Sequence, residues 1–234
     1  MKLSKSQIDQ LKSWISKKGY PEIDVQYEIL DHVACRIEKL LEENPKLSLE
    51  SAFQKVHAEF GVFGFSSLEE SYKKMIEKRL RGYFWEEVRS LAASAKILLP
   101  LGLTVVFFQS SYLLEKIFGF QEGGLALVGF GFLIFMAFWW YFTFGKDFKK
   151  YQNYASWRGN QGILMFTYIP MQVMAQGYKY FGNINLLDPA NLRLWQIIIV
   201  LLVFAGFVVL SVLPSLFNRT LRVTQALEQM YGEN

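Results

Sequence analysis

Four long stretches of the chain contain no charged residue, and they limit the possible fold more than any other feature of the sequence. They cover residues 97–114, 123–145, 160–178 and 194–217. A helix needs about 20 mainly apolar residues to cross a bilayer core, where backbone polar groups must be hydrogen-bonded within the helix. The sequence therefore predicts four transmembrane helices between residues 96 and 218.

Charged residues are concentrated in the first part of the chain. Residues 1–95 hold fifteen Lys or Arg and fifteen Asp or Glu, although 52% of the whole chain is hydrophobic. Cys35 is the one cysteine, so no disulfide can form within the chain. The first residues lack the apolar run of a secretory signal. We expect a separate domain at residues 1–81 that stays in the cytoplasm.

Basic residues in the short connections predict the orientation of the spans. The connection between the second and third spans carries Lys146, Lys149, Lys150 and Arg158. Arg219 and Arg222 follow the fourth span. Because cationic loops are retained in the cytoplasm, we expect both termini, including the tail at 219–234, to be cytoplasmic.

Capping residues and apolar spacing predict helices throughout the first domain. The expected ranges are 4–18, 21–44 and 48–61, followed by a fourth helix from Ser67. Gly19 and Gly61 end two of them, and Ser48 and Ser67 begin two others. The predicted fold is thus all-α, with a cytoplasmic four-helix domain followed by a four-helix transmembrane bundle.

The second of these helices carries candidate metal ligands. Winding it at 100° per residue predicts a core stripe of Ile23, Tyr27, Leu30, Ala34, Ile37 and Leu41. Glu28, His32 and Cys35 then share the opposite face at spacings that suit metal coordination. A solvated face, with Asp31 and Arg36 as neighbours, is the simpler interpretation, and no metal or cofactor is expected.

The junction before the first span is rich in basic residues. A predicted membrane-surface strip consists of Lys73, Lys74, Lys78, Arg79, Arg81, Trp85 and Arg89. Such cations are attracted to anionic lipid. Gly82 is expected to interrupt the helix, and residues 82–95 have the pattern of an amphipathic elbow lying along the membrane. A continuous helix over 67–114 is the alternative.

The predicted spans contain amides but no ionisable residue near their centres. Gln109 lies in the first span, and Gln172 and Gln176 share one face of the third. Hydrogen bonding between helices is the expected role of these amides, with the lining of a cleft as the alternative. Buried charge is usual in proton-coupled carriers, so a carrier is not favoured.

No set of nucleophile, base and acid stands out in the sequence, and no Gly-rich phosphate loop is present. GVFGF at 61–65 lacks the spacing and the lysine of such a loop. Equal numbers of acidic and basic residues in residues 1–95 argue against nucleic-acid binding. We do not expect an enzyme.

The first seventy residues resemble the HAAS domain, a small helical domain at the cytoplasmic N-terminus of many bacterial multi-span membrane proteins. The similarity rests on GYPEIDVQYEILDHVACRIE at 19–38, which includes Asp31-His32, and on SLESAFQKVHAEFG at 48–61. The resemblance implies a signalling or protein-interaction module in a bacterial inner membrane, and it carries over no catalytic residue.

These observations favour a non-enzymatic regulatory or adaptor protein, anchored in the bilayer, whose cytoplasmic domain binds a protein partner. The alternative is an accessory subunit of a larger membrane transport or envelope complex. A small carrier or lipid-acting enzyme fits least well, because the spans lack central charge.

Overall fold

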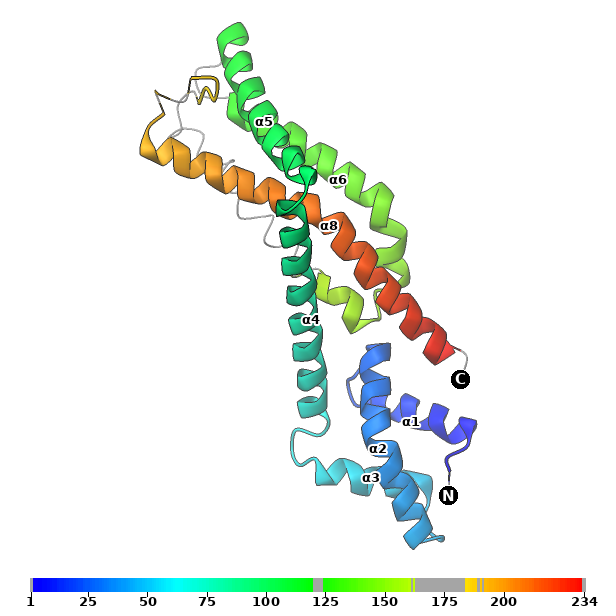
Figure 1. Cartoon of the computed structure of the whole chain (residues 1–234). Helices are drawn as coiled ribbons and strands as arrows, with labels where there is room; N and C mark the ends of the chain where they lie inside the picture. The colour runs from blue at the N-terminus through cyan, green and yellow to red at the C-terminus, as the bar shows by residue number, and fades with distance from the viewer. Residues whose placement is uncertain are drawn as a thin grey trace. The chain divides into compact units, whose positions relative to one another are not determined.

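The computed structural model describes residues 2–119, 124–160, 162, 184–188, 190 and 192–232, and these residues form a helical protein (Figure 1). The helices are α1 (Lys5–Lys17), α2 (Ile23–Glu43), α3 (Leu49–Glu59), α4 (Ser66–Ala92), η1 (Ala95–Ile97), α5 (Leu98–Phe118), α6 (Gly124–Lys150) and α8 (Leu194–Gly232). Residues 155–160 are also helical. The all-α prediction is confirmed for the described part of the chain.

Three helices are long and apolar enough to cross a membrane. They cover Ala95–Phe118, Leu127–Lys150 and Leu194–Met230. The first, second and fourth predicted spans are therefore found as helices, whereas almost all of the third, at 160–178, lies outside the described residues. A four-span bundle is thus not seen in the part of the chain that the structure describes. The last helix continues well past residue 217 and takes in most of the predicted tail.

The chain divides into two compact units, and the first is assembled from three separate segments. It comprises Met1–Arg81, Lys150–Gly159 and Thr220–Asn234, and we call it the composite unit. The second contains Gly82–Lys149 and Asn160–Arg219. The predicted N-terminal domain is therefore one part of a larger structure that also contains a connecting segment and the end of the last helix.

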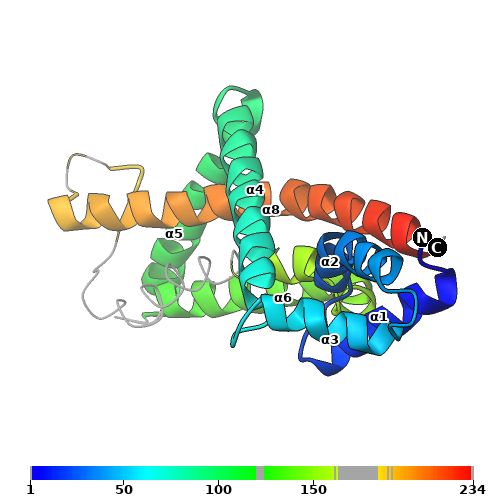
Figure 2. The same ribbon diagram turned by 90° about the horizontal axis from the view of Figure 1, so that it is seen from below.

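Local capping explains where the first helices begin. Ser4 and Gln7 form a reciprocal capping box at the start of α1, and the Ser48 hydroxyl accepts a hydrogen bond from the Ser51 amide at the start of α3. Gly19 follows α1 with a φ of 103°. In both views α2 packs against α1 and α3 (Figures 1 and 2).

The buried face of α2 differs from the predicted stripe. Val25, Ile29 and Val33 are fully buried, as is Ile37, whereas Ile23, Tyr27 and Ala34 are only partly buried. Leu30, Ile37 and Leu41 of the predicted stripe are buried as expected, but the buried face also extends to Val25, Ile29 and Val33, because α2 is covered by more than one neighbour. The prediction assumed that α2 packs through one narrow face, so it missed the residues that pack between α1 and α3.

Gly82 does not interrupt α4, contrary to the sequence prediction. The helix runs unbroken from Ser66 to Ala92. A glycine inside a helix lowers the stability of the helix by only about 1 kcal/mol relative to alanine. Residues just after Gly82 also make contacts with α8. Arg219 lies 2.7 Å from Glu86 and its guanidinium stacks 3.9 Å above the Tyr83 ring. The break lies at Ser94, whose extended backbone (φ −129°, ψ 163°) precedes η1.

The second unit has an aromatic core between its apolar helices. Its buried members are Phe107, Phe108, Ile184, Ile199, Val203 and Phe207. The Phe207 ring meets Phe107 and Phe132 in edge-to-face contacts with centroids 5.9 and 5.1 Å apart. These contacts join α5, α6 and α8 through side-chain packing.

Candidate functional site

The three candidate metal ligands of α2 do not form a ligand set. His32 Nε2 lies 3.2 Å from Glu28 Oε1, one helical turn away, and both side chains are substantially exposed. Cys35 is exposed and forms no disulfide. Among the described residues no group of three His, Cys, Asp or Glu side chains is placed to hold a metal ion.

Two lysines of the predicted membrane-surface strip have partners within the chain. Lys74 Nζ lies 2.6 Å from Glu70, and Lys73 contacts Glu69 and Glu22. The remaining members of the strip are Lys78, Arg79, Arg81, Trp85 and Arg89; all are exposed except Arg79, which is partly buried. Lys73 thus belongs to a site inside the composite unit.

One of the three predicted intramembrane amides lies in the described part of the chain. Gln109 Nε2 donates to Asn185 Oδ1 at 3.1 Å, which joins α5 to the segment before α8. The sequence predicted a hydrogen bond between two helices, but Asn185 lies in a non-helical segment, so Gln109 instead joins a helix to a connection. Gln172 and Gln176 lie outside the described residues.

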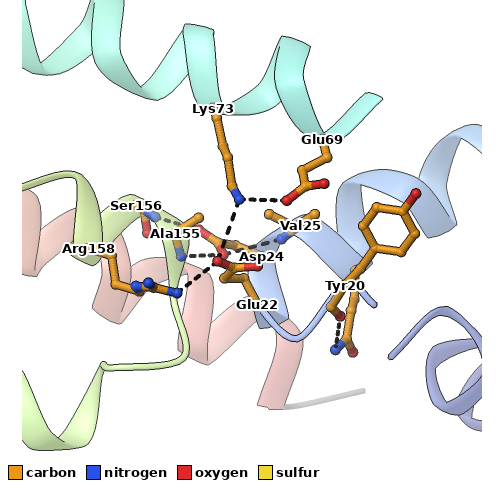
Figure 3. A network of polar contacts seen from close by, with 10 residues as sticks. Tyr20, Glu22, Asp24, Val25, Glu69, Lys73, Ala155, Ser156 and Arg158 are labelled. Carbon is orange, nitrogen blue, oxygen red and sulfur yellow. Dashed lines mark hydrogen bonds and ion pairs between the residues drawn. The ribbon is translucent and has the colours of Figure 1, made fainter. Parts of the chain in front are cut away.

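The principal polar site of the composite unit is centred on Asp24, in the first turn of α2 (Figure 3). Asp24 is fully buried. Its Oδ1 accepts the backbone N–H of Ala155 and its Oδ2 accepts that of Ser156, both at 2.8 Å. These amides begin the helical residues 155–160 and have no partner within that helix. A carboxylate from α2 thus caps a helix 131 residues further along the chain.

A neighbouring contact at the same junction pairs a backbone amide at the beginning of α2. The Ile23 amide donates to the Asn153 carbonyl at 2.8 Å, and the N-cap residue Glu22 makes no side-chain capping bond of its own. Two helix N-termini therefore face one site. Each carries about half a positive charge, so the two ends would repel each other without a nearby anion. The Asp24 carboxylate removes that repulsion.

Glu22 adds a second buried carboxylate beside Asp24. Its side chain is only 8% exposed, and its Oε1 lies 2.9 Å from Arg158 Nη1 and 3.6 Å from Lys73 Nζ. Burial alone would lower the pKa of Lys73, but hydrogen bonds and charge from Glu69 and Glu22 outweigh it and raise the pKa above its usual value. Figure 3 shows these side chains converging from α2, α4 and the segment after α6.

We call this set the Asp24 cluster: Glu22, Asp24, Glu69, Lys73 and Arg158, with the amides of Ala155 and Ser156. Its three carboxylates face two cations and two helix ends, so its charges are nearly balanced. Each of the three accepts a hydrogen bond or ion pair from the same chain. The cluster therefore acts as a structural junction between α2 and the segment after α6.

Close packing surrounds the junction. A Cβ atom on Gly159 would lie 2.7 Å from Leu80 Cδ1 and 3.2 Å from Ile76 Cγ2, so the helical residues 155–160 lie directly against α4. On another side, the hydroxyls of Ser156 and Thr224 are 3.3 Å apart in the interior. The segment after α6 is therefore enclosed by α2, α4 and α8.

A second polar contact fixes the end of α6 to the end of α8. Lys150 Nζ and the Tyr151 hydroxyl both contact Glu228 Oε2, at 2.9 and 2.8 Å. Tyr151 is 2% exposed. The composite unit thus holds the last residue of one candidate span and the extension of another.

The sequence interpretation missed the Asp24 cluster because its partners come from separate segments. The signal that was present is the aromatic content of the segment after α6, where Tyr151, Tyr154 and Trp157 occur within seven residues. All three are buried. Large aromatic residues are rarely concentrated in a loop that is fully exposed to water, so these three indicate that the segment packs against the rest of the protein.

No protein-family model matches the chain, and comparisons with curated proteins and with solved structures found no match. The fold and the site define a helical protein with three candidate membrane-spanning helices and a composite unit that includes the ends of two of them.

Proposed function

We propose that this chain is a non-enzymatic regulatory or adaptor protein of a bacterial inner membrane, whose composite unit binds a protein partner in the cytoplasm. The observation that carries the proposal is the assembly of that unit. The N-terminal domain is joined by buried contacts to Lys150–Gly159 and to the end of α8. A partner that shifts α2 therefore acts on the ends of the candidate spans. The HAAS resemblance of the first seventy residues supports the signalling role.

The composite unit also supports the predicted four spans and cytoplasmic termini. Residues 1–81, 150–159 and 220–232 lie in one compact unit, so they share one side of any membrane that the helices cross. In the proposed topology, α5 and α6, which are both long and apolar enough to cross a membrane, run out and back between the first two segments. If α8 returns the chain to the third segment, the proposed topology includes one more crossing, for which we propose the predicted span at 160–178, almost all of which lies outside the described residues.

Cysteine labelling tests this topology. In a Cys35→Ser background, we expect a cysteine at Leu187 to react with a membrane-impermeant maleimide added to intact spheroplasts. A cysteine at Gln152, which is also exposed, should react only after the membrane is opened. Equal protection of both positions in intact spheroplasts would contradict a fourth crossing.

Quantitative cross-linking of the full-length chain in its native membrane tests the adaptor role. We expect a partner protein to be enriched with the wild type and with Asp31→Asn, an exposed position on α2. Recovery should fall several-fold with Asp24→Ala, because the composite unit loses its junction. Absence of any protein enriched over an unrelated membrane protein would refute the proposal. Enrichment of integral membrane proteins that is insensitive to Asp24→Ala would favour the accessory-subunit alternative.

A further inference from the structure

Trp85 and Arg89 share an exposed face near the C-terminal end of α4. Trp85 is 54% exposed, and Arg89, also exposed, follows it by four residues, so the two side chains are neighbours on the helix surface. Lys96, in η1, is exposed as well. Neither Arg89 nor Lys96 pairs with a carboxylate in the part of the chain that the structure describes. All three residues belong to the second unit.

The carboxylates nearest to this face are held by a cation on another helix. Arg219 Nη1, on α8, lies 2.7 Å from Glu86 Oε2 and 3.9 Å from Glu87 Oε1. At 100° per residue, Glu87 lies about 160° around the helix from both Trp85 and Arg89. The carboxylates of this part of α4 are therefore occupied by Arg219, and the face that carries Trp85 and Arg89 keeps a positive charge.

The contacts of Arg219 also place this part of α4 beside the end of a candidate span. Residues 194–217 of α8 carry no charge, and Arg219 is the first charged residue after them. In a membrane that α8 crosses, the end of this apolar stretch lies at the level of the lipid headgroups. Because Arg219 contacts both Glu86 and the Tyr83 ring, the turn of α4 that contains Trp85 lies at the same level. The next helix, α5, begins a few residues after α4 ends (Figure 1).

We propose that Trp85, Arg89 and Lys96 bind the headgroup of an anionic phospholipid, and we call this set the headgroup site. The guanidinium fork of Arg89 matches the oxygens of a phosphate group. Trp85 offers an apolar ring and one N–H donor, a combination that is favoured at the headgroup level. The stem of Lys96 can lie along acyl chains while its ammonium reaches the headgroups. Two unpaired cations favour an anionic lipid over a zwitterionic one.

The helix that carries the headgroup site also reaches the Asp24 cluster. Glu69 and Lys73 of that cluster belong to α4, and the helix is unbroken from Ser66 to Ala92. A lipid bound at one end of α4 therefore restrains a helix whose other end takes part in the junction. This inference goes beyond the protein partner proposed above, because it makes the anionic lipid of the surrounding leaflet a second ligand of the chain.

Fluorescence quenching of the full-length chain in phosphatidylcholine vesicles tests the proposal. In a Cys35→Ser background, a bimane probe is attached through Ala92→Cys, an exposed position one turn after Arg89. The quencher is a nitroxide on the acyl chain of either phosphatidylglycerol or phosphatidylcholine, added in increasing mole fraction. Each basic residue close to an anionic surface contributes about fivefold in affinity, so half-maximal quenching should need at least tenfold less labelled phosphatidylglycerol than labelled phosphatidylcholine. Arg89→Gln and Lys96→Gln should each reduce this ratio about fivefold.

Lys116→Gln and Arg193→Gln are the matched controls, because they remove exposed cations at the other ends of the candidate spans and should leave the ratio unchanged. Arg89→Lys keeps the charge and should retain most of the preference. All substituted side chains are exposed, so the variants should unfold thermally like the parent chain. Equal quenching by the two lipids, or a preference that survives both Arg89→Gln and Lys96→Gln, overturns the proposal. Quenching by neither lipid also overturns it. Because the vesicles hold no other protein, these outcomes are independent of the adaptor role.

Discussion

Replacing Asp24 by asparagine should open the junction between α2 and the segment after α6 while leaving α2 itself folded. The introduced side-chain amide would retain one oxygen acceptor but place an N–H₂ group against the backbone amide of Ala155 or Ser156. The loss of one charge-assisted bond and the unpaired buried amide together cost on the order of 2–3 kcal/mol. The uncompensated helix N-termini then add to this destabilisation.

Hydrogen–deuterium exchange of the full-length chain measures this effect. A loss of 2–3 kcal/mol corresponds to roughly 30- to 160-fold faster exchange of the Ala155 and Ser156 amides. Asp31→Asn is the matched control, because it makes the same chemical change at an exposed position of α2. Unchanged exchange at these amides in Asp24→Asn would show that the Asp24 carboxylate does not hold the junction.

Trp157→Ala should have the largest effect on the stability of the composite unit. Trp157 is 1% exposed and its ring lies 6.2 Å from that of Tyr151, which contacts the end of α8. Truncation of a fully buried aromatic side chain to alanine typically costs about 3–5 kcal/mol, because the cavity collapses only in part. We expect the segment after α6 to detach from its neighbours in a large fraction of molecules.

Limited trypsin digestion in mild detergent reads out this detachment. Cleavage after Lys149, Lys150 and Arg158 should become at least tenfold faster in Trp157→Ala than in the wild type. Trp85→Ala removes the same ring from a position that is 54% exposed on α4, so it should leave cleavage at these sites unchanged. Equal susceptibility of the two variants would mean that Trp157 does not support the packing.

Features set by neighbouring residues could be predicted from the sequence. The three spans found as helices follow from uninterrupted apolar runs, and the starts of α1 and α3 follow from Ser4 and Ser48. The sequence left open whether α4 continues past Gly82, because contacts such as that of Glu86 with Arg219, more than a hundred residues away, cannot be read from neighbouring residues. The Asp24 cluster escaped prediction for the same reason: Asp24 satisfies amides that the sequence places in a remote connection.

The separation between Asp24 and its partners has a consequence during synthesis. At 5–20 residues per second, the 131 residues between Asp24 and Ala155 take roughly 7–26 s to be translated. Throughout that interval the emerging domain presents a carboxylate without its amide partners and unfilled packing positions, and the α8 segment arrives later still. Nascent chains are therefore open to chaperones and proteases until α8 has emerged, so the folding of the first domain waits on the insertion of the helices that follow it.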